Sequence, residues 1–208
     1  MLQYSTVEPH TLEILKGLLE IPELKDFSLV GGTALSLYYG HRISIDIDLF
    51  STSDFDNETL IDAIQSRFPG FSYRNTHNAV GIFGMIDGIK LDLIKHHHHP
   101  LLYEPNIENG IRLLSLPDLM AMKIAAIMKR GVKKDFWDIA ELLQHFTIDN
   151  FISYYTEKYP SNQLLVSVPF ALTYFIDAEE SEDPVCLKGQ TWESVKKIIQ
   201  QKVSEYLK

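Results

Sequence analysis

The stretch Phe27–Ser51, F-S-L-V-G-G-T-A-L-S-L-Y-Y-G-H-R-I-S-I-D-I-D-L-F-S, decides the fold that we expect for this chain. It predicts a strand, a glycine turn, a short helix and a second strand, in that order. Gly31 and Gly32 tolerate backbone angles that a Cβ forbids, so backbone N–H groups can approach a ligand closely there. We expect Thr33 to cap the helix and Gly40 to end it. A glycine turn that opens into a helix N-terminus is suited to phosphate.

Acidic and apolar residues alternate in the second strand of this stretch, over residues 45–49. Because a strand has a period of two, Asp46 and Asp48 share one face and the apolar residues share the other. Neighbouring carboxylates repel each other, and Asp is depleted in strands, so a positive partner is expected. Mg²⁺, which takes one or two carboxylates plus substrate phosphates, is the simplest candidate. The alternative is that both side chains line the solvent face of an edge strand.

These residues carry a resemblance to a known superfamily. Gly31-Gly32-Thr33 followed by Asp46-x-Asp48 resembles the nucleotidyltransferase superfamily. The sequence H-R-I-S-I-D-I-D-L-F around the two acids is most similar to its AbiEii/AbiGii toxin branch, from type IV toxin–antitoxin systems. The resemblance implies that the glycine turn holds the triphosphate of an NTP and that the two carboxylates hold Mg²⁺.

A third acid lies in a predicted hairpin over residues 79–95. Asp87-Gly88 is a strong signal for a two-residue hairpin turn, and the strand I-K-L-D-L-I-K follows it. Asp92 is an acid in this otherwise apolar strand, and an antiparallel neighbour could place it beside the first two. The resemblance implies that such a carboxylate helps to activate the attacking hydroxyl or to bind metal. The alternative is an exposed residue paired with Lys90.

Two helices after residue 114 carry further charged candidates. Lys123 lies among small apolar residues in the first of these helices, and burying an unpaired lysine is costly. It therefore either extends its amino group to solvent or meets an anionic ligand. Lys123, Arg130, Asp135 and Asp138 resemble the AbiEii-type pattern, which implies that Lys123 and Asp135 bind and orient the nucleotide. The basic residues of segment 129–134 have an alternative interpretation as a solvated turn between helices.

The remaining segments carry weaker signals. The histidine run His96–His99 has no other ligand at a recognisable spacing, so we expect an exposed loop, with a metal site as the alternative. Helices are expected over residues 8–20, 149–158, 162–176 and 191–207, with a kink or break at Pro169, and residues 101–110 are expected to form a loop.

Composition sets limits on the class of protein. The chain has 208 residues, of which 45% are hydrophobic and 23% charged, with a formal net charge of −9. This acidity argues against broad, nonspecific DNA binding, because proteins that coat nucleic acid are usually basic. Cys186 is the single cysteine, which excludes an internal disulfide. No apolar run approaches the ~20 residues of a membrane span, and no signal peptide is evident, so we expect a cytoplasmic protein without a membrane partner.

The combined prediction is an α+β protein with a nucleotidyltransferase-type mixed sheet over residues 1–114 and a helical region over residues 115–208 that completes the nucleotide cleft. The expected activity is Mg²⁺-dependent transfer of a nucleoside monophosphate from an NTP to an acceptor hydroxyl. The resemblance implies RNA, particularly tRNA ends, as the acceptor and an antitoxin as a partner. An aminoglycoside-like small molecule or a protein hydroxyl remains open as the acceptor. Alternatives are a nucleotide-binding regulatory module without catalysis, and an interaction protein.

Overall fold

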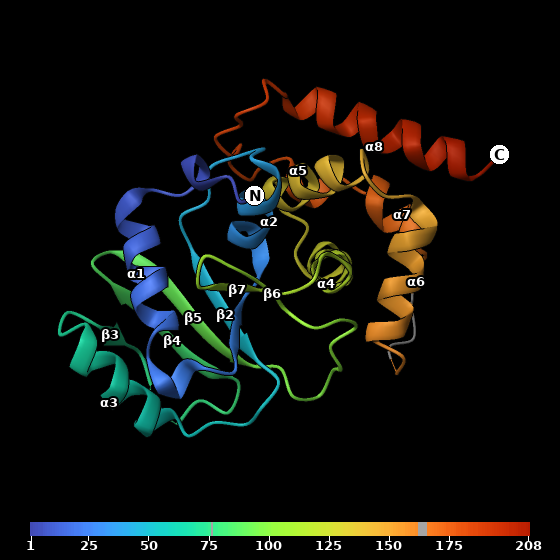
Figure 1. Ribbon diagram of the computed structural model, residues 1–208. Coiled ribbons are helices and arrows are strands. Elements are labelled where there is room, and N and C mark those ends of the chain that lie inside the picture. Colours follow the sequence, from blue (N-terminus) through green and yellow to red (C-terminus); the bar gives the residue numbers. More distant parts are fainter. Residues whose placement is uncertain (76, 162–165) are drawn as a thin grey trace.

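The computed structural model describes residues 1–75, 77–161 and 166–208, and Figure 1 shows a mixed sheet with helices around it. Among these residues the sheet has seven strands in the order β3-β4-β5-β2-β1-β7-β6. The strands are β1 (Phe27–Leu29), β2 (Ile47–Ser51), β3 (Ser72–Tyr73), β4 (Gly81–Ile86), β5 (Ile89–Lys95), β6 (Asn106–Glu108) and β7 (Ile111–Leu113).

The sheet mixes both pairing directions. β2 pairs with β5 in parallel, and so does β1 with β7, whereas the other four neighbouring pairs are antiparallel. The expected α+β class is therefore confirmed. One expectation is wrong. The strand that carries Asp92, β5, was expected to run antiparallel to β2, but the two strands are parallel.

Eight α-helices lie among the described residues: α1 (Pro9–Leu19), α2 (Gly31–Tyr39), α3 (Asn57–Arg67), α4 (Leu116–Lys129), α5 (Lys133–Leu142), α6 (Ile148–Lys158), α7 (Val168–Thr173) and α8 (Trp192–Tyr206). Three short 3-10 helices join them: η1 (Tyr4–Thr6), η2 (Pro22–Leu24) and η3 (Ile176–Ala178). None of the helices in this part of the chain is both long enough and apolar enough to cross a membrane.

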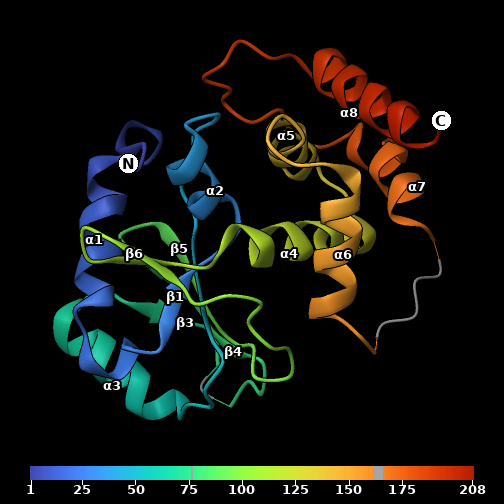
Figure 2. The same cartoon turned by 45° about the vertical axis from the view of Figure 1, so that its right-hand side comes forward.

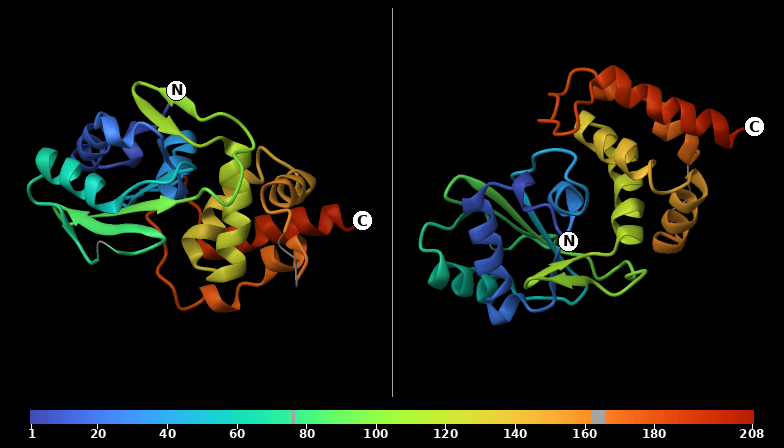
Figure 3. Two further views of the ribbon diagram at one scale, coloured as in Figure 1. Left: turned by 90° about the horizontal axis from the view of Figure 1, so that it is seen from below. Right: turned by 45° about the horizontal axis from the view of Figure 1, so that its top comes forward.

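One face of the central strands is the core of the sheet, and the other carries the acids. Ile47 and Leu49 of β2 are fully buried, as are Leu91 and Leu93 of β5. Helices α1 and α3 lie on one side of the sheet (Figure 3), and the large apolar cluster runs through these helices and strands. The acids that alternate with these residues, Asp48 in β2 and Asp92 in β5, are only partly buried. The strand period of two therefore places the apolar side chains on the buried face and the acidic side chains on the opposite face.

The predicted hairpin is confirmed. β5 covers residues 89–95, and Asp87 and Gly88 have φ angles of 51° and 83°. Positive φ at both central residues is what a type I′ turn requires, and its twist suits the flanking strands.

The helices after β7 form a separate layer beside the sheet. Figure 2 shows α4 next to the sheet, with α5 and α6 beyond it and α8 outermost. Ser115 caps α4 through a hydrogen bond from the Asp118 amide, as its position in the sequence predicted. The described strands all precede residue 114, and α4–α8 follow. The division into two regions at this residue stays a prediction.

One predicted helix needs correction. Of the helix expected over residues 162–176, residues 162–165 lie outside the described residues, and the rest contains only α7. Pro169 lies in the first turn of α7 instead of kinking a longer helix. This is the position that proline favours, because an N–H at the start of a helix has no intrahelical partner.

Candidate active site

The glycine turn is the tightest part of the candidate site. Helix α2 begins at Gly31, directly after β1, and its N-cap residue Val30 offers no side-chain acceptor. The first N–H groups of a helix have no intrahelical partners, so this end of α2 presents donors. Gly31 has a φ of 71°, and a Cβ there would lie 2.7 Å from Oδ2 of Asp48. Only glycine allows the turn to lie this close to the carboxylate.

Gly32 is constrained by a different neighbour. A Cβ at Gly32 would overlap the guanidinium of Arg42, whose side chain is 3% exposed. The arginine therefore lies against the first turn of α2. A buried cation next to bare helix amides strengthens the positive potential at this end of the helix.

Thr33 does not cap the helix as predicted, because it lies inside the first turn of α2. Its hydroxyl is within 2.9 Å of the Ser44 hydroxyl and also donates to the backbone carbonyl of Asp46. The threonine thus ties the start of α2 to the segment that leads into β2. This bond fixes the backbone of Asp46 against the glycine turn. The prediction that Gly40 ends the helix is confirmed, with a φ of 66°.

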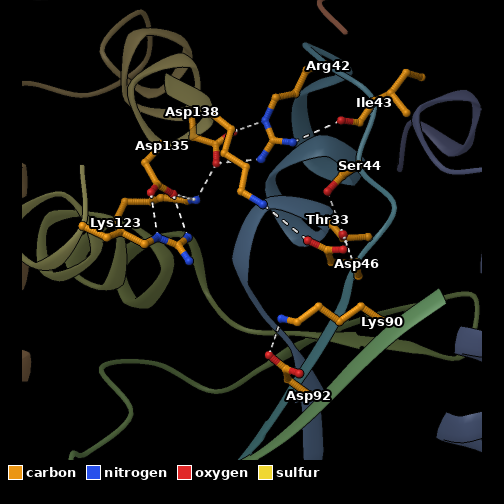
Figure 4. Close-up of polar contacts among 12 residues, drawn as sticks. Thr33, Arg42, Ile43, Ser44, Asp46, Lys90, Asp92, Lys123, Asp135 and Asp138 are labelled. Atoms are coloured by element: carbon orange, nitrogen blue, oxygen red, sulfur yellow. Dashed lines mark hydrogen bonds and ion pairs between the residues drawn. The ribbon is translucent and has the colours of Figure 1, made fainter. Parts of the chain in front are cut away.

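The three predicted carboxylates lie on neighbouring parts of the open face. Asp48 of β2 and Asp92 of β5 are directly paired in the parallel register. Asp46 lies just before β2, and its Oδ2 is 3.3 Å from Nζ of Lys134. Oδ2 of Asp92 accepts a hydrogen bond from Nζ of Lys90 at 2.5 Å. Figure 4 shows Asp92 beside Lys90, and Asp46 below Thr33 and Ser44.

Charge and burial act together on these groups. Burial, with the nearby negative charges of Asp92 and Asp46, raises the pKa of Asp48 above its ordinary value, although Lys90 opposes the shift. Burial tends to lower the pKa of Lys90, but the hydrogen bond to Asp92 and the charge of Asp48 outweigh it and raise this pKa. Three carboxylates this close need positive charge among them.

The donor set fits a divalent cation. All the candidate ligands are carboxylate oxygens, the type that Mg²⁺ prefers. Oδ1 of Asp92 is buried and has no hydrogen-bond partner among the described residues. In the same part of the chain, no group of three or more His, Cys, Asp or Glu side chains is arranged to hold a metal. Mg²⁺ is usually held by one or two carboxylates plus substrate phosphates, so the carboxylate oxygens of Asp46 and Asp48 are the ligand type that such a site needs.

A buried ionic cluster, formed by His41, Arg42, Lys123, Asp135 and Asp138 with the exposed Arg130 at its edge, lies next to the carboxylates. Asp138 of α5 accepts hydrogen bonds from Nε and Nη2 of Arg42 at 2.7 and 3.0 Å, and its Oδ1 is 2.7 Å from Nε2 of His41. Its other oxygen is 2.5 Å from Nζ of Lys123. Figure 4 shows this convergence of α4, α5 and the loop after α2.

Asp135 is the second acid of the cluster. It accepts from Nζ of Lys123 at 2.8 Å and from Nε of Arg130 at 3.1 Å. Burial alone would raise the pKa of Asp135, but Lys123 and Arg130 lower it below its ordinary value. The same opposition, with Arg42 and Lys123 as the cations, holds the pKa of Asp138 well below 3.8. Both acids are therefore charged inside the protein.

The cluster changes how the predicted nucleotide-binding residues are placed. The side chain of Lys123 is 7% exposed and that of Asp135 is fully buried, so each binds the other. The outer basic residues are more accessible, since the side chain of Arg130 is 55% exposed and that of Lys134 is 43% exposed. Lys133 pairs with Asp183 instead. Of this segment, Lys134 contacts Asp46 and Arg130 interacts with the charge of Asp48, so these two residues face the carboxylates.

Two residues of the cluster were not predicted as site residues. His41 and Arg42 come just before the acids in the sequence, and both are buried against Asp138. A signal was present, because the pattern H-R-x-S-x-D-x-D includes them. Their partner lies nearly 100 residues away in the chain, and no local pattern gives that pairing.

The four histidines of the run His96–His99 differ in their exposure to solvent. His97 and His98 are exposed, as expected for a loop, but His96 and His99 are partly buried. The His96 ring lies 5.2 Å from Phe50, and the His99 ring lies 4.7 Å from Tyr159. Burial lowers the pKa of His96 to about 4. Packing accounts for this pair better than metal binding does.

Taken together, the site offers helix amides, three carboxylates and several cations in one place. Amides and cations bind phosphate oxygens, and carboxylates bind a divalent cation or a proton. Such a set is suited to polyphosphate chemistry, in which positioning and charge neutralisation are the main sources of rate.

Comparisons with known proteins agree with this chemistry. A family model described as "Nucleotidyl transferase AbiEii toxin, Type IV TA system" matches residues 13–159. An uncharacterized protein of Aquifex aeolicus (strain VF5) is 32% identical over 206 residues, which cover 94% of this chain and 95% of the relative.

Solved structures share the fold. MenT4, a nucleotidyltransferase toxin from Mycobacterium tuberculosis H37Rv, matches with a TM-score of 0.57 at 12% identity, over 94% of this chain and 82% of that chain. The antibiotic-resistance factor ANT(2'')-Ia matches with a TM-score of 0.51 at 12% identity, over 71% of this chain and 90% of that chain. At these identities the similarity is one of fold.

Proposed function

The chain belongs to the AbiEii nucleotidyltransferase toxin family of type IV toxin–antitoxin systems, and we propose that it transfers a nucleoside monophosphate from a Mg²⁺-bound NTP to a hydroxyl of an RNA end. One observation carries this proposal. Asp48 and Asp92 are paired in register on adjacent strands, and Asp48 lies within contact distance of the Gly31 turn. Amide groups that can donate hydrogen bonds to phosphate therefore lie next to the acids.

The triphosphate has a natural place at the start of α2. The amides of Gly31, Gly32 and Thr33 face it there, and the accessible side chains of Arg130 and Lys134 neutralise its charge from the opposite side. Asp46 and Asp48 would hold Mg²⁺, and metal binding by Asp92 is the alternative to the base role given to it below. When bound, the ion would neutralise charge on the transferred phosphate and on the leaving pyrophosphate.

Asp92 is the proposed general base. The acceptor oxygen forms a bond to the α-phosphorus while the bond from that phosphorus to the bridging oxygen breaks, and pyrophosphate leaves with the electron pair. The hydroxyl proton passes to Asp92, whose buried Oδ1 has no partner among the described residues. Lys90 holds the other oxygen of this carboxylate in place.

Lys123 and Asp135 orient the nucleotide indirectly in this proposal. Lys123 joins Asp135 to Asp138, and Asp135 holds the guanidinium of Arg130. The cluster thereby fixes α4 and α5 at the angle that directs Arg130 and Lys134 toward the acids. Shifts of about 1 Å in such positioning groups are known to cost large factors in rate.

The acceptor and partners follow from the family and the charge. A tRNA or other RNA end in the cytoplasm fits a toxin, and a cognate antitoxin would be the protein partner. The net charge of −9 restricts contact to a few nucleotides, because a long RNA would meet a repulsive surface. An acceptor end needs only local positive charge.

The test is transfer from an α-labelled NTP to cellular RNA by the wild type, Asp46→Asn and Asp48→Asn. Each substitution keeps the side-chain size and removes a charge, and we expect transfer to fall by about 100-fold or more. Asp87→Asn is the matched control, since it removes the charge of an exposed acid in a turn conformation that Asn adopts as readily as Asp. Wild-type transfer by either site variant would refute the proposal. Mg²⁺-NTP binding without any product from the wild type would favour a non-catalytic module.

A further inference from the structure

A groove opens on the sheet directly beside Asp92. Its volume is about 520 Å³, and Arg74, Phe83, Met85 and Lys90 are among the residues that line it. Its lining residues come from β3, β4, β5 and the loop between β3 and β4. Asp92 and Lys90 are shared with the proposed nucleotide site, whereas Arg74, Phe83 and Met85 have no role there.

The strand register makes the groove a continuation of the catalytic row. Asp48 is paired with Asp92, and Asp92 is paired with Phe83. The Arg74 amide donates to the Phe83 carbonyl at 3.2 Å, which brings Arg74 beside the next strand. Paired residues share one face of a sheet, so the side chains of Asp48, Asp92 and Phe83 form a row on the face that carries the acids, and Arg74 lines the groove next to Phe83.

The groove combines an apolar floor with basic edges. Phe83 is partly exposed, and Met85 is 45% exposed. Arg74 is exposed and has no acidic partner within ion-pair distance among the described residues. The acid of the lining, Asp92, already binds Lys90. This chemistry suits a planar base with a phosphate.

The position of the groove agrees with the direction of attack. In phosphoryl transfer, the attacking and leaving oxygens lie roughly in line on opposite sides of the phosphorus. The α2 amides, with Arg130 and Lys134, lie beyond Asp48 on the side where the polyphosphate leaves. A hydroxyl held in the groove reaches Asp92 from the other side, because β5 lies between β2 and β4 in the sheet.

We propose that this groove binds the acceptor, with the terminal unpaired nucleobase of an RNA stacked on Phe83 and Met85 and its phosphate paired with Arg74. The proposal rests on the nucleotidyl transfer proposed above. It adds the site and the chemical features by which the acceptor is recognised. Base stacking tolerates any sequence, so specificity for the end of an RNA comes from its being unpaired.

The test measures RNA binding separately from chemistry. A fluorescently labelled, short single-stranded oligoribonucleotide is titrated with the wild type, Phe83→Leu, Phe83→Trp, Arg74→Gln and the control Arg67→Gln. Arg67 is an exposed arginine on α3, outside the groove. Phe83→Leu keeps an apolar side chain but removes the aromatic face, so we expect the Kd to rise about 5- to 150-fold. Phe83→Trp restores binding.

Salt dependence identifies the phosphate contact. Each phosphate neutralised on a single strand contributes about −0.7 to the slope of log K against log salt. Arg74→Gln should therefore make the slope shallower by about 0.7, and Arg67→Gln should leave it unchanged. In transfer assays Phe83→Leu and Arg74→Gln should each raise the KM for RNA more than they lower kcat. Both variants should still bind Mg²⁺-NTP in calorimetry.

The outcomes separate the two proposals. If the wild type transfers nucleotide to RNA and the groove variants match it in Kd, KM and salt slope, the groove assignment is wrong and the transferase stands. Transfer by the wild type to an aminoglycoside or a protein, and not to RNA, also overturns the groove assignment. If the wild type binds no Mg²⁺-NTP, the proposed function itself has failed.

Discussion

Replacing Asp138 by Asn removes one charge from the centre of the buried ionic cluster and keeps the size of the side chain. Its carboxylate is fully buried and contacts Arg42, Lys123 and His41. Lys123 keeps Asp135 as a partner, but Arg42 loses its one carboxylate partner among the described ion pairs. The variant therefore leaves a buried guanidinium with neutral acceptors only.

The expected cost follows from that geometry. Breaking a buried pair from one side typically costs about 3–5 kcal/mol, because the remaining charge stays out of water. With a urea dependence of about 2.5 kcal/mol per M, the unfolding midpoint should fall by about 1–2 M. Urea unfolding followed by circular dichroism at neutral pH measures this shift. Asp62→Asn, at an exposed position of α3, is the matched control and should move the midpoint little.

The pH dependence of the free energy of unfolding tests independently whether the ionised Asp138 carboxylate stabilises the fold. The folded-state pKa of Asp138 is well below 3.8, so its contribution to the free energy of unfolding is fully present above pH ~4 and is lost as the pH falls through the folded value. Asp138→Asn lacks this contribution at every pH. The stability difference between wild type and variant should therefore be largest near neutral pH and shrink below pH ~4.

Two results would refute this reasoning. A midpoint shift no larger than that of the control would mean that the cluster does not stabilise the fold. A stability difference that grows on acidification would mean that the carboxylate is protonated in the folded protein, contrary to its surroundings.

Other substitutions test other parts of the site. Gly31→Ala should weaken Mg²⁺-NTP binding at least 10-fold by calorimetry, because its Cβ would meet an acid of the site, whereas Gly110→Ala, with a similar φ of 79° and open space around it, should carry only the backbone strain. Lys134→Ala should raise the KM for NTP and leave the urea midpoint nearly unchanged, because its side chain is 43% exposed; an unchanged KM would remove it from phosphate binding. Asp118→Asn should lower the free energy of unfolding by about 3 kcal/mol without altering NTP affinity, since Lys158 stays buried with the Pro100 carbonyl as a partner but without a carboxylate. A variant as stable as the wild type would contradict that assignment.

Much of the sheet was predictable because its signals are local. The alternation predicted the correct faces for residues 47–49, and Asp87-Gly88 predicted the hairpin and the limits of β5. The strand expected from residue 45 begins only at Ile47, since Asp46 precedes β2 and Ile45 is 56% exposed. These patterns depend on the strand period and on turn angles, which neighbouring residues determine. Strand β6, in a segment predicted as a loop, is short and lies at the edge of the sheet, where local patterning is weak.

The pairing of distant segments was less predictable. The parallel neighbour of β2 depends on a crossover of nearly 40 residues, and local pattern does not give strand direction. The same limit applies to the burial of Asp138, which no local pattern predicts. Its burial depends on Arg42, whose charge only the folded chain brings to it. Buried charges follow from long-range complementarity and not from helical periodicity.

The most direct measurement of the central claim compares NTPs labelled at two positions. The wild-type protein is incubated with Mg²⁺ and RNA, using an NTP labelled at the α-phosphate in one reaction and at the γ-phosphate in another. The α-label should appear on the RNA and the γ-label in pyrophosphate, both lost with Asp48→Asn. Appearance of the γ-label on the acceptor, or of neither label with any NTP, would contradict nucleotidyl transfer at this site.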